Sequence, residues 1–410
     1  MIETPTNLMV PTYPRSVQPG IPRLSPPPAG WSTRCFGDLL KVVQRPVRMT
    51  GEGEYDLVTV KRSRGGIESR GRFRGKDISV KSQFSLEGGD FLISKRQIVH
   101  GACAVVPEEF AGSIVSNEYA VLRCKSGLDI GFLRYLSHSV YFQQTCFHSS
   151  IGVHVEKMIF KLEDWLKFRV NVPPLDEQKR IATGFEAVDA KLTALRKKVD
   201  GLRQFKAGLM QRLFSQELRF TREDGSDFPD WEEKPFSEIA TQAREQFDPR
   251  KENGRPRVIE LEHLESGSGR ILSSTDIQDQ ISLKNRFRSG DVLFGKLRPY
   301  LRKFARPDFD GVCSSEIWVL RGRKDVSNGF LYVLVQSPMF SQVVNISSGS
   351  KMPRADWKTI AGADFPVPCP EEQEKIADAL SALDAKIDAV TDQITHMETF
   401  KKGLLQKMFV

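Results

Sequence analysis

Two stretches of this chain decide its fold. Val172–Phe214 reads VPPLDEQKRIATGFEAVDAKLTALRKKVDGLRQFKAGLMQRLF, and Val367–Phe409 reads VPCPEEQEKIADALSALDAKIDAVTDQITHMETFKKGLLQKMF. They agree at more than a third of their positions with a constant offset, which shared helical composition alone does not produce. The chain is therefore predicted to contain the same unit twice.

The repeat extends upstream of these stretches. Gly89-Asp90-Phe91-Leu92 corresponds to Gly290-Asp291-Val292-Leu293, and Trp31 corresponds to Trp231. Short β-like runs alternate with Gly, Asp and Ser turns between these points, as at Tyr55–Val60, Ile114–Leu122 and Glu316–Leu320. Helical stretches are predicted near Gly131–Gln144 and Gly329–Val344, so the units are expected to be mixed α/β. The predicted organisation is a Pro-rich disordered extension (1–29), a first globular domain (30–172), a first long helix (173–217), a second globular domain (228–367) and a second long helix (368–410).

Each long helix carries an apolar seam with steps of four and three residues. A sustained period of 3.5 residues keeps such a seam facing a partner helix, which is the condition for a coiled coil. Because a globular domain separates the two helices, we expect them to pair with each other in antiparallel directions. The predicted seam consists of Ile181, Phe185, Val188, Leu192, Leu195, Val199 and Leu202 in the first helix, and Ile376, Leu380, Leu383, Ile387, Val390, Ile394 and Met397 in the second. The fold class is thus α+β, with two pseudo-symmetric mixed domains joined by an antiparallel coiled coil.

Composition limits the possible functions. The chain has 410 residues, a net charge of +8 and a pI near 9.1, which suits a polyanionic partner. It has no apolar run long enough for a membrane span, and its Pro-rich start is unlike a signal peptide. Six scattered cysteines without a CxxC pair indicate buried thiols in a reducing cytoplasm.

Catalytic and cofactor motifs are not found. Gly71–Asp77 resembles a phosphate loop but has one spacer too few and ends in Asp instead of Ser or Thr. Cys146, His148 and His154 have no counterparts in the second repeat, which argues against a metal site. Pro307-Asp308 lacks the Glu-x-Lys of a nuclease, and no amino-methyltransferase motif is present. We therefore assign no catalytic, cofactor-binding or metal-binding residue.

Basic residues instead gather in each globular domain, with glycines and aromatic residues between them. Such clusters suit contact with phosphates, and their guanidinium groups suit guanine O6 and N7. The candidate DNA-binding residues are Lys61, Arg62, Arg64, Arg70, Arg72, Arg74, Lys76, Lys95 and Arg96 in the first domain, and Lys284, Arg286, Arg288, Lys296, Arg298, Tyr300, Arg302, Lys303 and Arg306 in the second.

These residues carry a family resemblance over about residues 30–410. PPLDEQKRIA (173–182), EEQEKIADAL (371–380) and FPDW (228–231) resemble the specificity subunit of type I restriction-modification systems. GDVLFGKLRPYLRKF (290–304) and SSEIWVLRG (314–322) are also similar to that family. The first repeat departs from the pattern, with Ser94-Lys95-Arg96 where a Gly-Lys-Leu-Arg form is expected.

The resemblance implies a non-catalytic subunit that reads a bipartite DNA target, one half-site per domain. It implies that the two helices act as a ruler and as a platform for two methyltransferase subunits, with restriction subunits further out. S-adenosylmethionine, ATP and Mg²⁺ are then expected on those partners and not on this chain. An alternative is the recognition subunit of a related multisubunit system that cleaves on both sides of its site. A DNA-modifying enzyme and a coiled-coil adaptor that never binds DNA are the other classes left open.

Overall fold

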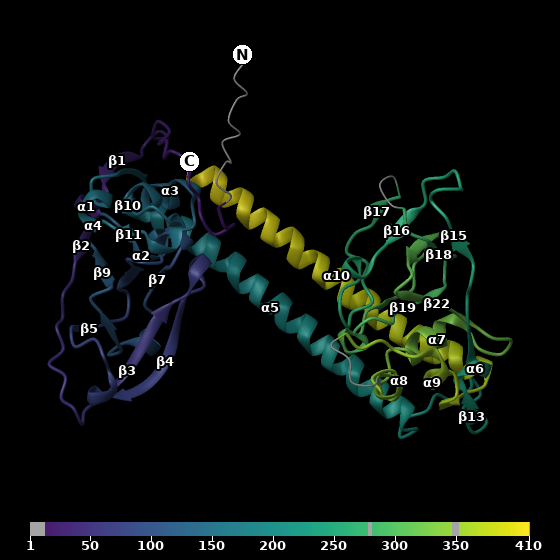
Figure 1. The fold of residues 1–410 in the computed structure, drawn as a ribbon. Coiled ribbons are helices and arrows are strands. Elements are labelled where there is room, and N and C mark those ends of the chain that lie inside the picture. The colour runs from purple at the N-terminus through teal and green to yellow at the C-terminus, as the bar shows by residue number, and fades with distance from the viewer. Residues whose placement is uncertain (1–12, 278–280, 347–351, 410) are drawn as a thin grey trace, which may run out of the picture. The chain divides into compact units, whose positions relative to one another are not determined.

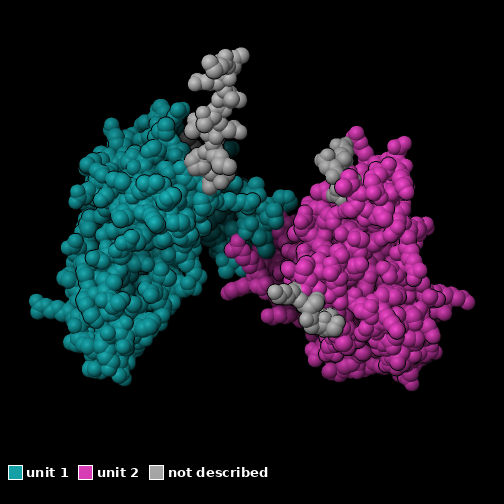
Figure 2. Space-filling view, in the orientation of Figure 1, with its two compact units in different colours: residues 1–194, 393–410 teal, residues 195–392 magenta. Residues whose placement is uncertain are grey.

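The computed structural model describes residues 13–277, 281–346 and 352–409, and it divides into two compact units (Figure 1, Figure 2). Unit 1 comprises the chain up to residue 194 together with residues 393–410, and unit 2 comprises residues 195–392. Each unit therefore contains one globular domain, one part of helix α5 (Leu175–Phe214) and one part of helix α10 (Pro370–Met408). Neither these helices nor any other described helix carries an apolar stretch sufficient to cross a membrane.

Unit 1 is built from two four-stranded sheets and two short antiparallel pairs. The sheets have the strand orders β2-β9-β6-β7 and β4-β3-β8-β5, and the pairs are β1-β12 and β10-β11. The strands are β1 (Ser32–Cys35), β2 (Leu40–Val42), β3 (Glu54–Val60), β4 (Ile67–Arg74), β5 (Gln83–Ser85), β6 (Phe91–Ser94), β7 (Cys103–Val105), β8 (Ile114–Ser116), β9 (Tyr119–Cys124), β10 (Ser150–Ile151), β11 (Ile159–Phe160) and β12 (Arg169–Val172). The helices are α1 (Phe36–Leu39), α2 (Ile130–Leu136), α3 (Val140–His148) and α4 (Leu162–Trp165).

Unit 2 repeats part of this plan. Its β13-β23 pair matches β1-β12, and its sheet β14-β22-β19-β20 matches β2-β9-β6-β7, but its other sheet has five strands in the order β15-β18-β21-β16-β17. The strands are β13 (Glu232–Pro235), β14 (Ala240–Gln242), β15 (Gln246–Phe247), β16 (Arg257–Ile259), β17 (Thr275–Asp276), β18 (Lys284–Phe287), β19 (Val292–Gly295), β20 (Phe304–Ala305), β21 (Gly311–Ser314), β22 (Ile317–Gly322) and β23 (Asp364–Val367). The helices are α6 (Phe236–Ile239), α7 (Asn328–Leu334), α8 (Pro338–Val344) and α9 (Trp357–Ala361).

The long helices pair in antiparallel directions within each unit. In unit 1, Phe185 of α5 stacks on Phe409 of α10, and Asp189 accepts a hydrogen bond from Lys401. The residue numbers of the α10 partners therefore decrease as those along α5 increase, which is the antiparallel order. In unit 2, Lys206 of α5 contacts Asp384 of α10 at 2.7 Å. All fourteen predicted seam residues are buried or half-buried, which agrees with the coiled-coil period.

The same ion pair occurs once in each unit. Lys206 and Lys401 occupy equivalent positions in the repeat, as do Asp189 and Asp384. The register therefore follows the pseudo-symmetry of the sequence. Phe205 and Phe400, which follow the last seam residues by three positions where the period calls for four, are 61% and 56% exposed.

The Pro-rich extension differs from the expectation of disorder where the structure describes it. Val17 is only 4% exposed, Tyr13 makes an edge contact with Phe147, and the Asn171 side-chain amide donates a hydrogen bond to the Ser25 carbonyl. These contacts hold residues 13–29 against the first domain. Residues 1–12 lie outside the described residues.

Two predicted helices are each divided into two. The stretches near Gly131–Gln144 and Gly329–Val344 are predicted to be helical, and each contains two helices, α2 followed by α3 and α7 followed by α8. Ser139 and Ser337 cap the second helices by accepting hydrogen bonds from Phe142 N and Phe340 N. Because the serine side chain accepts a hydrogen bond from the first turn of the second helix, the second helix begins at the serine and the first helix ends before it.

Candidate nucleic-acid interface

A buried glutamine fixes the first turn of each long helix to its own globular domain. The Gln178 amide donates to the carbonyls of Gly127 and Pro173, and its oxygen accepts from Asp129 N. Gln373 makes the same three contacts in unit 2, with Asp325 O, Pro368 O and Ser327 N. Both side chains are at most 1% exposed. The Glu-Gln pair of the repeat is thus a structural anchor, which the repetition indicated but did not explain.

The preceding glutamate completes this anchor. Trp31 Nε1 donates to Glu177 at 3.1 Å, and Trp231 Nε1 donates to Glu372 at 2.9 Å. The carboxylate of Glu372 is fully buried and also receives two hydrogen bonds from Arg219, which satisfies the charge. The long helices are therefore rigidly joined to the start of each globular domain.

A second pair of anchors shapes the Gly-Asp turns. Asp90 is fully buried and forms ion pairs with Arg45 and Arg123. Asp291 forms an ion pair with Arg321 at 2.9 Å. The hydrogen bonds that Arg321 donates to Asp291, together with its hydrogen bond and ion pair to Glu245, raise the pKa of Arg321, so the guanidinium stays charged. Each aspartate also accepts a hydrogen bond from a backbone amide three residues earlier. These turns are structural in both units.

Most basic residues of the first domain lie on or next to an antiparallel ribbon formed by β3 and β4, with Arg70, Arg72 and Arg74 on β4 itself. Nearly every residue of β4 is exposed. Most of the predicted cations contact acids there: Lys61 contacts Glu68, Arg62 contacts Glu156, Arg72 contacts Asp56, and Arg74 and Lys76 contact Glu52. The hydrogen bond from Arg72 lowers the pKa of Asp56 and keeps that carboxylate ionised. The ribbon is therefore less positive than the sequence suggested.

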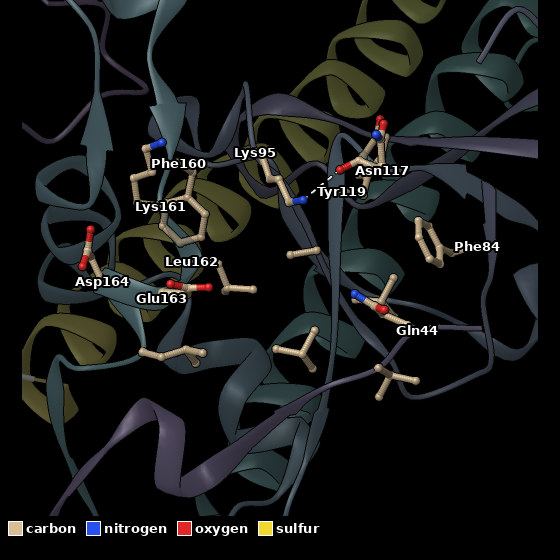
Figure 3. A pocket seen from close by; sticks show the side chains of 15 residues that line it. Gln44, Phe84, Lys95, Asn117, Tyr119, Phe160, Lys161, Leu162, Glu163 and Asp164 are labelled. Atoms are coloured by element: carbon tan, nitrogen blue, oxygen red, sulfur yellow. Dashed lines mark hydrogen bonds between the residues drawn. The ribbon is translucent and has the colours of Figure 1, made fainter. Parts of the chain in front are cut away.

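Arg64, Arg96 and Lys95 have surroundings of their own in unit 1. Arg64 is half-buried next to Gly101, and its burial lowers its pKa. Arg96 forms a two-pronged ion pair with Glu118. Lys95 lines a cavity of about 560 Å³, where its Nζ donates to Asn117 O at 2.8 Å (Figure 3). The walls of this cavity include the aromatic rings of Phe84, Tyr119 and Phe160.

Several predicted residues of unit 2 have structural partners. Lys284 is 5% exposed and forms a 2.7 Å ion pair with Glu260, which corrects its assignment as a DNA-facing cation. Lys303 donates to the carbonyls of Leu261 and Leu264, and the Arg302 side chain donates to Gln336 O. A side chain held in this way braces the fold.

The other predicted cations of unit 2 range from half-buried to exposed. Arg286 pairs with Glu252, Arg288 with Glu245, and the Arg306 guanidinium lies over the Tyr332 ring. Lys296 is half-buried and Arg298 is exposed. Tyr300 is 56% exposed in a short turn between Arg298 and Arg302, and both of these arginines have left-handed backbone angles. This turn presents an exposed aromatic ring that is flanked in the sequence by two arginines.

The other expectations have simpler outcomes. All six cysteines are free; Cys103, Cys146 and Cys313 are buried, whereas Cys35, Cys124 and Cys369 are half-buried. Burial raises the pKa of the Cys103 thiol to about 12, which makes it unreactive. Within the described part of the chain, no three His, Cys, Asp or Glu side chains are grouped to hold a metal ion.

Known proteins match this chain along both repeats. The family described as "Type I restriction modification DNA specificity domain" matches residues 28–200 and 229–398. The MjaVIII type I restriction enzyme specificity subunit of Methanocaldococcus jannaschii is 23% identical and covers 92% of both chains. The HindI specificity subunit of Haemophilus influenzae is 26% identical over 44% of this chain and 41% of its own.

Solved structures share the fold. The HsdS subunit of Thermoanaerobacter tengcongensis matches with a TM-score of 0.50 and 19% identity, covering 93% of this chain and 97% of its own. The type I restriction-modification S subunit of M. genitalium matches with a TM-score of 0.56 and 15% identity, covering 95% and 99%.

Proposed function

The chain belongs to the type I restriction-modification DNA specificity family, and on that premise we propose that it reads a bipartite DNA target with one domain per half-site. The observation that carries this proposal is the duplication of one unit, with equivalent anchors at Gln178 and Gln373. Two copies of one DNA-reading unit in a single chain suit a target made of two separated half-sites. The relatives named above are type I specificity subunits, which favours this class over a system that cleaves on both sides of its site.

The chain itself would be non-catalytic and would work in a complex with other restriction-modification subunits in the cytoplasm. Two methyltransferase subunits would bind along α5 and α10, and restriction subunits would join them. S-adenosylmethionine, ATP and Mg²⁺ would be bound by those partners. Basic residues that remain accessible, such as Arg70 and Arg298, would contact DNA phosphates or bases.

The experiment is to co-express the chain with its methyltransferase subunit and to sequence the methylated bases of the host genome. We expect a methylated motif of two specified half-sites separated by an unspecified gap. An enzyme that acted alone would methylate or cut DNA without the partner, and an adaptor would show no salt-dependent DNA binding. Either result would contradict the proposal.

The ruler role has its own test. α5 spans about 60 Å at 1.5 Å per residue, so the paired helices are long enough to fix the distance between half-sites about one DNA turn, ~34 Å, apart. Four residues inserted into the connection 215–229 should alter the gap and leave both half-sites unchanged. A change in the half-site bases would contradict this role.

A further inference from the structure

The β3–β4 ribbon of unit 1 has the shape of a groove-reading element. It pairs Glu54–Val60 with Ile67–Arg74, and the outer strand β4 is exposed over nearly its whole length. A two-stranded ribbon is one of the few protein elements that fit the major groove of B-form DNA. The ribbon is therefore able to bring side chains of β4 to the edges of bases.

A β-bulge at the middle of the ribbon isolates Arg70. Leu57 pairs with Gly71 and Val58 pairs with Ser69, so Arg70 has no residue opposite it on β3. Gly71 takes a φ of +100°, and its amide donates to Ser69 Oγ at 3.1 Å. Bulges redirect one side chain away from the regular alternation and are frequent beside functional sites. In a regular strand, Arg70, Arg72 and Arg74 would share one face of the ribbon, and the bulge removes Arg70 from this two-residue alternation.

The charges on the ribbon distinguish Arg70 from its neighbours. Arg72 donates two hydrogen bonds to Asp56, and Arg74 lies 3.8 Å from Glu52. Arg70 is exposed and has no acidic or hydrogen-bonding partner among the residues that the structure describes. Its guanidinium can therefore bind a new acceptor without first breaking an ion pair.

The surroundings of Arg70 leave room for a ligand. Arg70, Phe73, Asp77 and Gln83 line a cavity of about 150 Å³ beside the ribbon. Gln83 is 4% exposed, and its Oε1 accepts no hydrogen bond in the described structure. The free guanidinium at the edge of this hollow supplies donors and is therefore suited to a planar group that offers two acceptors, whereas Gln83 Oε1 calls for a donor.

We propose that Arg70 reads a guanine in the half-site of unit 1, by donating two hydrogen bonds to O6 and N7 in the major groove. This assignment rests on the proposed function and adds to it the element, the groove and the base. The planar fork of arginine matches these two acceptors, and the pair is the commonest specific contact to guanine. Arg72 and Arg74 lie close by on the same strand, but their ion pairs leave Arg70 as the base-reading arginine of the ribbon.

Unit 2 reads its half-site with a different element. The strands of its five-stranded sheet are two to four residues long, and none of them forms a comparable exposed ribbon within the described residues. A change at Arg70 should therefore affect one half of the target only. This asymmetry makes the inference separable from a general loss of DNA binding.

The test uses the full chain in complex with its methyltransferase subunit and compares Arg70→Ala, Arg70→Lys and the control Lys41→Ala, which removes an exposed cation of β2. We expect both Arg70 variants to lose about 5- to 150-fold of their preference for guanine at one position of one half-site. Arg70→Lys keeps the charge but not the fork, so its salt dependence should stay near that of wild type. Lys41→Ala should keep the full motif.

Methylated-base sequencing and competition binding with single-substituted duplexes measure these effects. The assignment is overturned if Arg70→Lys keeps its full preference at every position, or if both half-sites weaken equally. If Arg70→Ala does not assemble with the methyltransferase subunit, the result for Arg70→Lys is sufficient to test the assignment. If the wild-type complex gives no bipartite motif, the proposed function fails, whereas a normal wild-type motif that Arg70→Lys leaves unchanged refutes only this inference.

Discussion

Replacing Lys206 by methionine tests the physical account of the helix pair. The Lys206 ammonium contacts both oxygens of Asp384 and the Gln336 side chain, and the lysine and aspartate side chains are only 12% and 23% exposed. Removing one partner of a buried pair leaves the other charge without compensation, at a cost of about 3–5 kcal/mol. Because this pair is not fully buried, we expect Lys206→Met to lower the free energy of unfolding by about 3 kcal/mol near neutral pH.

The loss of stability in Lys206→Met should depend on pH in a definite direction. Burial raises the pKa of Asp384, while Lys206 lowers it, so the substitution should raise that pKa further. A carboxyl with a higher pKa in the folded state binds its proton more readily when folded, and the folded state gains stability as the pH falls through that pKa. The deficit of the variant should therefore be largest at about pH 8 and smaller by about 1 kcal/mol or more at about pH 5.

Urea unfolding followed by circular dichroism measures the deficit at both pH values. Lys198→Met, which removes an exposed lysine of α5 in the same unit, is the matched control and should change stability by less than about 0.5 kcal/mol. The double variant Lys206→Met/Asp384→Leu should recover most of the loss because no buried charge remains. An equal deficit at both pH values would refute the assignment of Asp384 as the uncompensated group.

Three further predictions concern stability. Gln373→Ala removes three buried hydrogen bonds and should cost about 2–3 kcal/mol, measured by urea unfolding; a loss below 0.5 kcal/mol, by the same scale, would contradict the anchor. Leu192→Asp places a charge at a position that is 4% exposed and should cost several kcal/mol, whereas Phe205→Asp at a 61% exposed position should cost little; similar losses would show that the seam is wrongly placed. Val17→Ala should cost about 1–2 kcal/mol and lower the melting temperature if residues 13–29 pack as described, and an unchanged melting temperature would show that they do not.

The family membership places these effects in context. Under the proposed function, the helices would keep their register while partner subunits and DNA are bound. The equivalent pairs Lys206–Asp384 and Lys401–Asp189 repeat the same contact once in each unit. We expect variants at either pair to weaken assembly with the methyltransferase subunit as well as stability.

The long helices and the repeat follow directly from the sequence. The sequence predicts a first long helix at 173–217, and α5 runs from Leu175 to Phe214. Helix periodicity depends on residues three and four apart, so it is legible in one sequence. The strand at Tyr55–Val60 was also predicted, and the structure extends it by one residue to Glu54. In contrast, Ile114–Leu122 divides into β8 and β9, which belong to different sheets.

The candidate interface depended on tertiary structure to a greater degree. From the sequence, Arg70, Arg72 and Arg74 were equivalent members of a basic cluster. Strand pairing places Asp56 opposite Arg72, whereas Arg70 lies at the bulge. Lys284 was predicted to be a DNA-binding cation, but it is buried and forms an ion pair with Glu260, which lies 24 residues away in the sequence. Local sequence therefore determined the helices, the duplication and the excess of positive charge. Which cations stay free for DNA was decided by the folded chain, because an ion pair between residues far apart in sequence exists only once the strands are in register.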